Sequence, residues 1–81
     1  MFYTYILYSQ NTNKFYIGYT QNIETRLHKH NAGSTPSTRA GRPWKMLYFE
    51  AFDTKTQAIL REREIKAKKS RKYIEELIAQ R

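Results

Sequence analysis

Two runs of apolar and aromatic residues, separated by a short polar stretch, open the chain. Phe2–Ser9 is rich in Tyr, Ile and Leu, and residues 14–19 have a similar composition, which is typical of β-strands. Residues 11–13 between them are Asn, Thr and Asn, which favour turns. We therefore predict an antiparallel hairpin over residues 2–19, closed by a loop of two or four residues.

Helical spacing follows the hairpin. Ile23, Leu27 and His30 recur at intervals of four and three residues, so they share one face of a predicted helix. Asn22 is expected to cap the start of this helix, and Gly33 to end it.

The chain changes character twice after this helix. Residues 31–43 hold two glycines and both prolines among Ser, Thr and Arg, which predicts a loop. Residues 46–52 are a third predicted strand. Residues 54–69 contain neither Gly nor Pro and predict a long helix, with Asp53 or Thr54 as its cap.

A final helix is expected to begin at Ser70. Its apolar stripe consists of Tyr73, Ile74, Leu77 and Ile78. The order of elements is then β-β-α-β-α-α, without an internal repeat or a linker. The pattern predicts one domain over residues 1–81 of the α/β (α+β) class, a small three-stranded antiparallel sheet flanked by helices.

The composition indicates which classes of binding partner and of chemical site to expect. The formal net charge of +8 favours a polyanion, with nucleic acid as the first candidate and an anionic membrane surface as the second. A merely solubilising surface charge is the alternative. The chain has no cysteine, which excludes disulfides and cysteine-based metal sites. Its N-terminus predicts neither a signal peptide nor a membrane span, so we expect a soluble, cytoplasmic protein.

The hairpin carries the first candidate chemistry. A loop with an even number of residues places Tyr5 and Tyr16 on the same face, since strand side chains alternate. Gly18 follows on that face and is expected to leave it open. Two phenols beside a glycine gap suit a binding surface, but they also suit an ordinary cross-strand aromatic pair, which strand statistics alone favour.

The first predicted helix carries a second pair of candidate functional residues. Arg26 and His30 are four residues apart, so they share a helix face, beside Ile23 and Leu27. A guanidinium and an imidazole next to an apolar stripe either pair with a buried group or line a cleft. Together they suit a phosphate-facing role as well as a structural one.

The long predicted helix carries a third candidate functional group, a carboxylate. Glu62 lies at helical spacing from Ala58 and Ile65, so it is expected to face inward. An inward-facing carboxylate has to be paired, hydrogen-bonded or metal-bound. A surface salt bridge to Arg61 or Lys66 is the alternative.

At these residues the chain resembles the GIY-YIG nuclease superfamily. The second signature stands unaltered at residues 16–18 as Tyr-Ile-Gly, and only Tyr5 matches the first. Eleven residues separate Tyr5 from Tyr16, Arg26 lies ten beyond Tyr16, and His30 four beyond Arg26. These intervals look like the family's spacing.

The likeness continues to about residue 69. Residues 61–66 resemble the family's metal-carboxylate helix, which places its glutamate on Glu62. The pair Tyr19-Thr20 after the signature looks like the stand-alone, single-domain branch. Nuclease members often carry an asparagine after the metal helix, and none follows Asn31 here.

The resemblance implies hydrolysis of a phosphodiester in nucleic acid, DNA more than RNA, one strand at a time. Glu62 would hold one Mg²⁺ or Mn²⁺ together with waters and phosphate oxygens. Tyr5, assisted by Tyr16, would be the general base toward water. Arg26 would stabilise the charge that grows on the phosphate, and His30 would orient groups or shuttle a proton.

Basic side chains in the loop and at the junction of the last two helices are expected to contact the nucleic-acid backbone without reading sequence. They are Arg39, Arg42, Lys45, Lys66, Lys69, Arg71 and Lys72. A non-catalytic nucleic-acid-binding module and an assembly protein with an acidic partner are the competing hypotheses. The absence of a separate recognition unit leaves room for an unknown protein partner, and for a monomer or a weak dimer.

Overall fold

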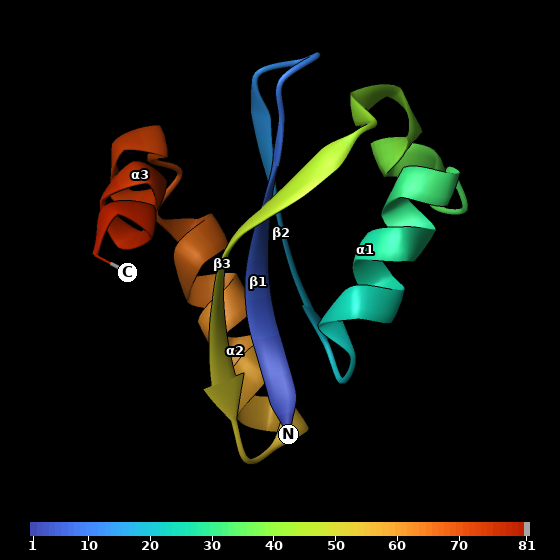
Figure 1. The fold of residues 1–81 in the computed structure, drawn as a ribbon. Coiled ribbons are helices and arrows are strands. Elements are labelled where there is room, and N and C mark those ends of the chain that lie inside the picture. The colour runs from blue at the N-terminus through green and yellow to red at the C-terminus, as the bar shows by residue number, and fades with distance from the viewer. Residues whose placement is uncertain (81) are drawn as a thin grey trace.

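The computed structural model describes residues 1–80, and Arg81, the last residue of the expected domain, lies outside them. Its centre is a three-stranded antiparallel sheet with the order β2-β1-β3 (Figure 1). The strands are β1 (Phe2–Ser9), β2 (Lys14–Thr20) and β3 (Trp44–Phe52). The predicted fold class and the order β-β-α-β-α-α are confirmed.

The hairpin of β1 and β2 is closed by a four-residue loop, one of the two predicted lengths. Its register sets Tyr16 opposite Leu7 and Gly18 opposite Tyr5. Because side chains alternate along a strand, Tyr5, Tyr16 and Gly18 lie on the same face of the sheet, as predicted. Strand β2 pairs on one side only, so its other edge is unpaired within the sheet.

Helix α1 (Ile23–Ala32) lies between the predicted cap residues Asn22 and Gly33, but it includes Asn31 and Ala32, which were wrongly predicted to belong to the loop. The side chain of Asn22 accepts a hydrogen bond from the backbone N–H of Thr25 at 3.0 Å, which satisfies one of the free donors of the first turn. Gly33 takes a left-handed conformation with φ of 81°, which glycine adopts without steric cost.

The predicted loop over residues 31–43 contains a short 3₁₀ helix, η1 (Pro36–Gly41), and β3 begins two residues earlier than predicted. Both differences depend on Trp44. Its indole is buried and donates to the carbonyl of Thr38 at 2.7 Å. The amide of Asn31 brackets its backbone, accepting from the N–H at 2.6 Å and donating to the carbonyl at 3.2 Å. Local residue patterns do not report such contacts.

Helices α2 (Lys55–Ala67) and α3 (Arg71–Ala79) follow β3. Thr54 and Gln57 form a capping box at the start of α2, which selects Thr54 from the two predicted caps. Lys69, expected inside the long helix, has φ of 47° and belongs to the turn between α2 and α3.

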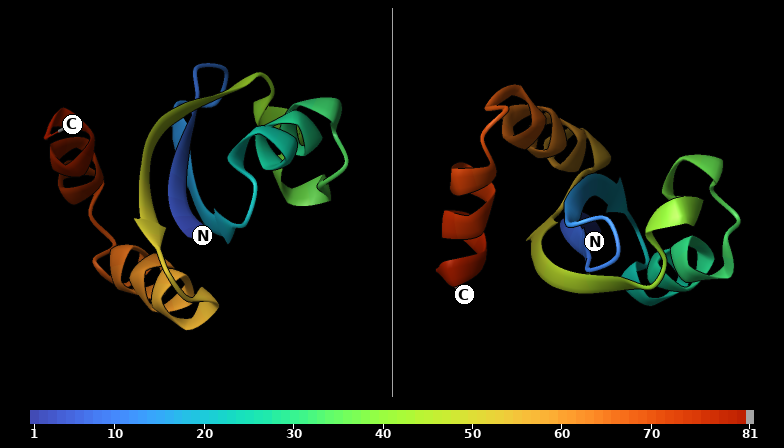
Figure 2. Two further views of the ribbon diagram at one scale, coloured as in Figure 1. Left: turned by 60° about the horizontal axis from the view of Figure 1, so that its bottom comes forward. Right: turned by 90° about the horizontal axis from the view of Figure 1, so that it is seen from above.

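The helices cover both faces of the sheet, α1 on one and α2 with α3 on the other (Figures 1 and 2). Each face has its own apolar cluster. Tyr5, Leu7 and Trp44 are the buried residues on the α1 side. The buried residues on the α2 and α3 side are Ile6, Ile17, Ile65 and Leu77. The central strand β1 contributes to both clusters, so the sheet is rigid where it carries Tyr5.

Candidate active site

A cleft of about 510 Å³ is lined by β1, edge strand β2, α1 and α2. It brings together four of the five residues that the sequence singles out as catalytic, and each of the four lies on a different element. Its polar lining includes Tyr5, Tyr16, Arg26, Glu62 and Lys55, and Gly18 also lines it. His30, the fifth predicted residue, is not among the lining residues and lies behind the tyrosines.

The two tyrosines are in ring contact, with 6.4 Å between their centroids. The expectation that Gly18 leaves an open gap beside them is wrong, because the Tyr5 phenol fills it. A Cβ atom at Gly18 would stand 2.6 Å from Tyr5 Oη and 2.8 Å from Cζ, well inside van der Waals contact. Glycine at this position therefore allows Tyr5 to lie across β2.

His30 holds the Tyr5 phenol from behind. The imidazole is 1% exposed, and its Nε2 lies 3.1 Å from Tyr5 Oη. On the other side of the ring, Nδ1 lies 2.8 Å from Thr38 Oγ1. The Tyr16 ring meets the imidazole edge-on at 4.9 Å between centroids. Both tyrosines are thus packed on one buried histidine.

The electrostatics of this group favour neutral side chains. Burial raises the pKa of Tyr5 above its ordinary value, the neighbouring Tyr16 and Glu62 add to the rise, and Arg26 opposes it. Burial also lowers the pKa of His30, and the charge of Arg26 acts in the same direction. Near pH 7 the protein therefore holds a neutral phenol against a neutral imidazole.

Arg26 lines the cleft from α1 and is half-buried. Among residues 1–80 its guanidinium has no hydrogen-bond or ion-pair partner. A half-buried guanidinium without a protein partner is suited to bind an anion such as a phosphate.

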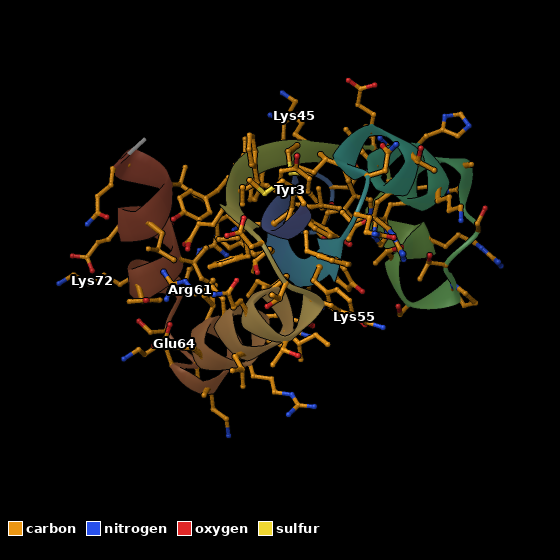
Figure 3. The ribbon with its side chains drawn as sticks, turned by 90° about the horizontal axis from the view of Figure 1, so that it is seen from below. Tyr3, Lys45, Lys55, Arg61, Glu64 and Lys72 are labelled. Atoms are coloured by element: carbon orange, nitrogen blue, oxygen red, sulfur yellow. The ribbon has the colours of Figure 1, made fainter. Side chains whose placement is uncertain are left out.

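Glu62 approaches the cleft from α2, and its side chain is 15% exposed. Its Oε2 pairs with Lys66 Nζ at 2.6 Å, so the salt-bridge alternative is realised with Lys66. Arg61, the other candidate, pairs with Glu50 on β3 at 3.0 Å and is directed to the space between α2 and α3 (Figure 3).

The described residues contain no group of three or more His, Asp or Glu side chains that could hold a metal ion. Glu62 is the carboxylate that lines the cleft. A single carboxylate fits Mg²⁺ or Mn²⁺ bound mainly by waters and substrate oxygens, since Mg²⁺ commonly uses one or two carboxylates beside phosphate. It does not fit a closed, all-protein metal cage.

Lys55 is a cleft residue that the sequence-based reasoning missed. It lies in the first turn of α2, and Figure 3 shows it on the side of that helix toward α1. The signal was available, because Lys55 stands seven residues before Glu62, two helical turns along the same face.

The basic residues expected to contact nucleic acid do not share one role. Three of them form hydrogen bonds with other residues of the chain. Arg39 donates to the carbonyl of Gly33 at 3.0 Å and Arg42 to the carbonyl of Arg39 at 2.8 Å, so both brace the loop around η1. Arg71 donates to the carbonyl and the side-chain oxygen of Asn13, both at 2.7 Å, and ties α3 to the hairpin tip.

The others are exposed, but they lie on different elements. Lys66 pairs with Glu62, and Lys69 occupies the turn before α3. Figure 3 shows Lys45 on β3 and Lys72 on α3, well apart from each other. Lys45 therefore lies apart from Lys72, whereas Lys66 and Lys69 line the same pocket.

Comparison with known proteins gives a consistent result. The family model of the GIY-YIG catalytic domain matches residues 1–74. A UPF0213 protein of Natronomonas pharaonis is 41% identical over 78 residues, which cover 95% of this chain and 89% of that protein. A UPF0213 protein of Staphylococcus haemolyticus is 43% identical over 65 residues, covering 79% and 78%.

A UPF0213 protein of Haloquadratum walsbyi is 45% identical over 53 residues, which cover 64% of this chain and only 60% of that protein. The solution NMR structure of a UPF0213 protein from Bacillus halodurans superposes with a TM-score of 0.62 at 32% identity, covering 100% of this chain and 86% of the other. Within residues 1–80, no helix has the length and apolar character needed to cross a membrane.

Proposed function

The chain belongs to the GIY-YIG family, a family of nuclease domains, and from its cleft we propose that it hydrolyses phosphodiester bonds in nucleic acid with the help of one divalent cation. Its relatives are UPF0213 proteins, a stand-alone GIY-YIG family. The observation that carries the proposal is the shared cleft: a phenol pair, an unpaired guanidinium and a carboxylate face the same space.

Glu62 is the residue that would hold the cation, Mg²⁺ or Mn²⁺. When bound, the cation would polarise a phosphoryl oxygen and stabilise the leaving oxygen. Lys66 pairs with one oxygen of this carboxylate, so it would compete with the cation, and its side chain is 50% exposed. Before the cation binds, the ammonium group neutralises Glu62.

The general base is the Tyr5 phenol acting together with His30. The raised pKa of Tyr5 opposes a standing phenolate, so proton transfer has to be concerted. As the attacking water gives its proton to Tyr5 Oη, the phenol proton passes to His30 Nε2, 3.1 Å away. The water oxygen forms its bond to phosphorus while the bond to the leaving oxygen breaks, and that oxygen takes a proton from solvent. Tyr16 orients the water.

Two cations of the cleft would act on the phosphate. Arg26 is proposed to stabilise the negative charge that develops on the equatorial oxygens, because its guanidinium has no partner among residues 1–80. Lys55 adds a second positive charge from the opposite wall, on α2. Together they would offset the repulsion between Glu62 and the phosphate.

One cleft acts on one strand, so we propose nicking of DNA, with little sequence specificity. The exposed lysines on β3, the turn before α3, and α3 itself would add phosphate contacts, and each contact contributes about one unit to the salt dependence of binding. These residues are Lys45, Lys69 and Lys72.

The test is relaxation of supercoiled plasmid by the purified chain in Mn²⁺, in Mg²⁺ and in EDTA. We expect metal-dependent nicking that Glu62→Gln and Tyr16→Phe reduce about 100-fold, the loss of roughly 3 kcal/mol of transition-state stabilisation. Glu76→Gln, which changes an exposed carboxylate on α3 outside the cleft, is the matched control and should nick normally. Equal nicking by all variants would identify a contaminating nuclease. Binding of DNA without nicking by the wild-type protein would overturn the proposal in favour of a non-catalytic module.

A further inference from the structure

A buried threonine outside the cleft is in contact with His30, one of the candidate catalytic residues. Thr38 lies in η1, in a segment that the sequence predicts to be a plain loop, and it is 1% exposed. Its hydroxyl contacts His30 Nδ1 at 2.8 Å and the carbonyl of Thr35 at 3.2 Å. Tyr5, His30, Thr38 and Thr35 therefore form one continuous chain of hydrogen bonds that begins at the cleft.

The two ends of this chain determine the direction of its protons. The Thr35 carbonyl can only accept, so the Thr38 hydroxyl donates to it and presents a lone pair to His30 Nδ1. Nδ1 must then carry the imidazole proton, which leaves Nε2 as the acceptor for the Tyr5 phenol. The reverse tautomer would turn the Thr38 hydroxyl away from Thr35 and point the Tyr5 proton elsewhere, so it satisfies fewer of the contacts present.

The position of Thr38 is itself fixed. Its backbone N–H donates to the Thr35 carbonyl at 3.1 Å, and its own carbonyl accepts from Trp44 Nε1 at 2.7 Å. The Trp44 ring lies against Gly41, where a Cβ atom would stand only 2.3 Å from Cζ2. The hydroxyl is thus held on the imidazole by a buried tryptophan and by a glycine that makes room for it.

We propose that Thr38 is a positioning residue: it holds His30 in the tautomer with the proton on Nδ1, so that Nε2 faces Tyr5 as a proton acceptor. The role rests on the proposed function, because the Tyr5 phenol matters only if it takes a proton from water. Thr38 does not line the cleft and would act through His30. Partners of this kind fix the tautomer and orientation of functional histidines in metal sites, and their loss there costs about 10- to 100-fold.

The direct test is long-range ¹H–¹⁵N NMR of the imidazole nitrogens, which distinguishes the protonated from the unprotonated nitrogen without any turnover. The chain has two histidines, so a His28→Gln variant assigns the His30 signals. In the wild-type protein near pH 7.5 we expect Nδ1 protonated and Nε2 unprotonated. Thr38→Val keeps the side-chain shape but removes the hydroxyl, and we expect it to raise the population of the other tautomer and to lower nicking about 10- to 100-fold.

Two variants separate positioning from packing. Thr38→Ser keeps the hydroxyl and should retain both the wild-type tautomer and most of the nicking. Ser37→Ala removes the neighbouring, exposed hydroxyl of η1 and should change neither. A wild-type protein with the proton on Nε2 would overturn the proposal, as would an unchanged tautomer in folded Thr38→Val. The wild-type spectrum and Thr38→Ser decide the matter if Thr38→Val does not fold.

The outcome for Thr38 is distinguishable from the outcome for the proposed function. If the wild-type protein never nicks DNA but shows the expected tautomer and its loss in Thr38→Val, the nuclease assignment fails while the positioning of His30 by Thr38 stands as a property of the fold. If nicking is present and Thr38→Val leaves it and the tautomer unchanged, the nuclease assignment stands and the role of Thr38 is wrong.

Discussion

Replacing Gly18 with alanine adds one methyl group at the point where the Tyr5 ring crosses β2. The new Cβ would lie 2.6 Å from Tyr5 Oη, 2.8 Å from Cζ and 3.2 Å from Cε2. Carbon atoms in contact are ordinarily about 3.5–4.0 Å apart, so the ring has to move by roughly 1 Å. Tyr5 has little freedom to do so, since it is 1% exposed and hydrogen-bonded to buried His30.

The expected loss of stability combines two costs and one gain. Overpacking a buried site costs about 1–3 kcal/mol. Pulling the phenol from His30 Nε2 leaves a buried polar group unsatisfied, at about 1–3 kcal/mol. The change from glycine restricts the unfolded chain and returns about 0.4–1 kcal/mol, because Gly18 does not need a positive φ. Gly18→Ala should therefore lower the free energy of unfolding by about 1–6 kcal/mol.

Urea denaturation of four proteins checks this reasoning: wild type, Gly18→Ala, Tyr5→Phe and the double variant. Removing the Tyr5 hydroxyl takes away the nearest clashing atom, so Gly18→Ala should cost at least about 1 kcal/mol less in the Tyr5→Phe background. The same cycle with Tyr16→Phe, whose atoms are not the nearest to Gly18, should show little coupling. A Gly18→Ala protein as stable as the wild type, with the Tyr5 and His30 signals unmoved, would refute the account.

Three further outcomes follow from contacts described above. Acidification from pH 7 to 5.5 should lower stability, because burial lowers the pKa of His30 in the folded protein below its ordinary value of about 6.5, so the unfolded chain binds the proton first. Urea midpoints of the wild type and of His30→Gln measure this effect, and a wild-type stability that rises over this pH range would contradict it. Lys66→Gln should bind Mn²⁺ up to about fivefold more tightly in calorimetry, because the cation no longer competes with the Lys66–Glu62 ion pair, which contributes at most about 1 kcal/mol. Weaker binding of Mn²⁺ by Lys66→Gln would exclude this competition. Arg71→Gln should cost about 1 kcal/mol in urea by releasing Asn13 from α3, and an unchanged midpoint would mean that this exposed tie contributes nothing.

Much of the candidate site could be predicted from sequence because its members sit at regular intervals on regular elements. The alternation of a strand fixes which face Tyr5 and Tyr16 share, and the helical period fixes the direction of Arg26 and Glu62. The caps at Asn22 and Thr54 depend only on local hydrogen bonds, so they too were predictable. None of these inferences requires knowledge of a distant contact.

The features that the sequence does not reveal depend instead on contacts between residues far apart in the chain. Nothing near Gly18 in the sequence states that the Tyr5 ring will fill the space beside it, since that depends on the register of the hairpin. The contact between Arg71 and Asn13, which lie 58 positions apart in the chain, cannot be inferred from the sequence either. Thr38 reads as an ordinary loop residue until Trp44 holds it against His30. These properties arise from tertiary contacts.

The tie between Arg71 and the hairpin tip also bears on the order in which the chain matures. Translation delivers the cleft residues before α3, and domains fold as their segments leave the ribosome. Yet the sheet that carries Tyr5 and Tyr16 is covered on its other face partly by Leu77 of α3. A nascent chain that has released the whole cleft still lacks this cover and the fastening at Asn13. The hairpin therefore emerges early but gains its support from α3 only after residues 71–79 have also left the ribosome.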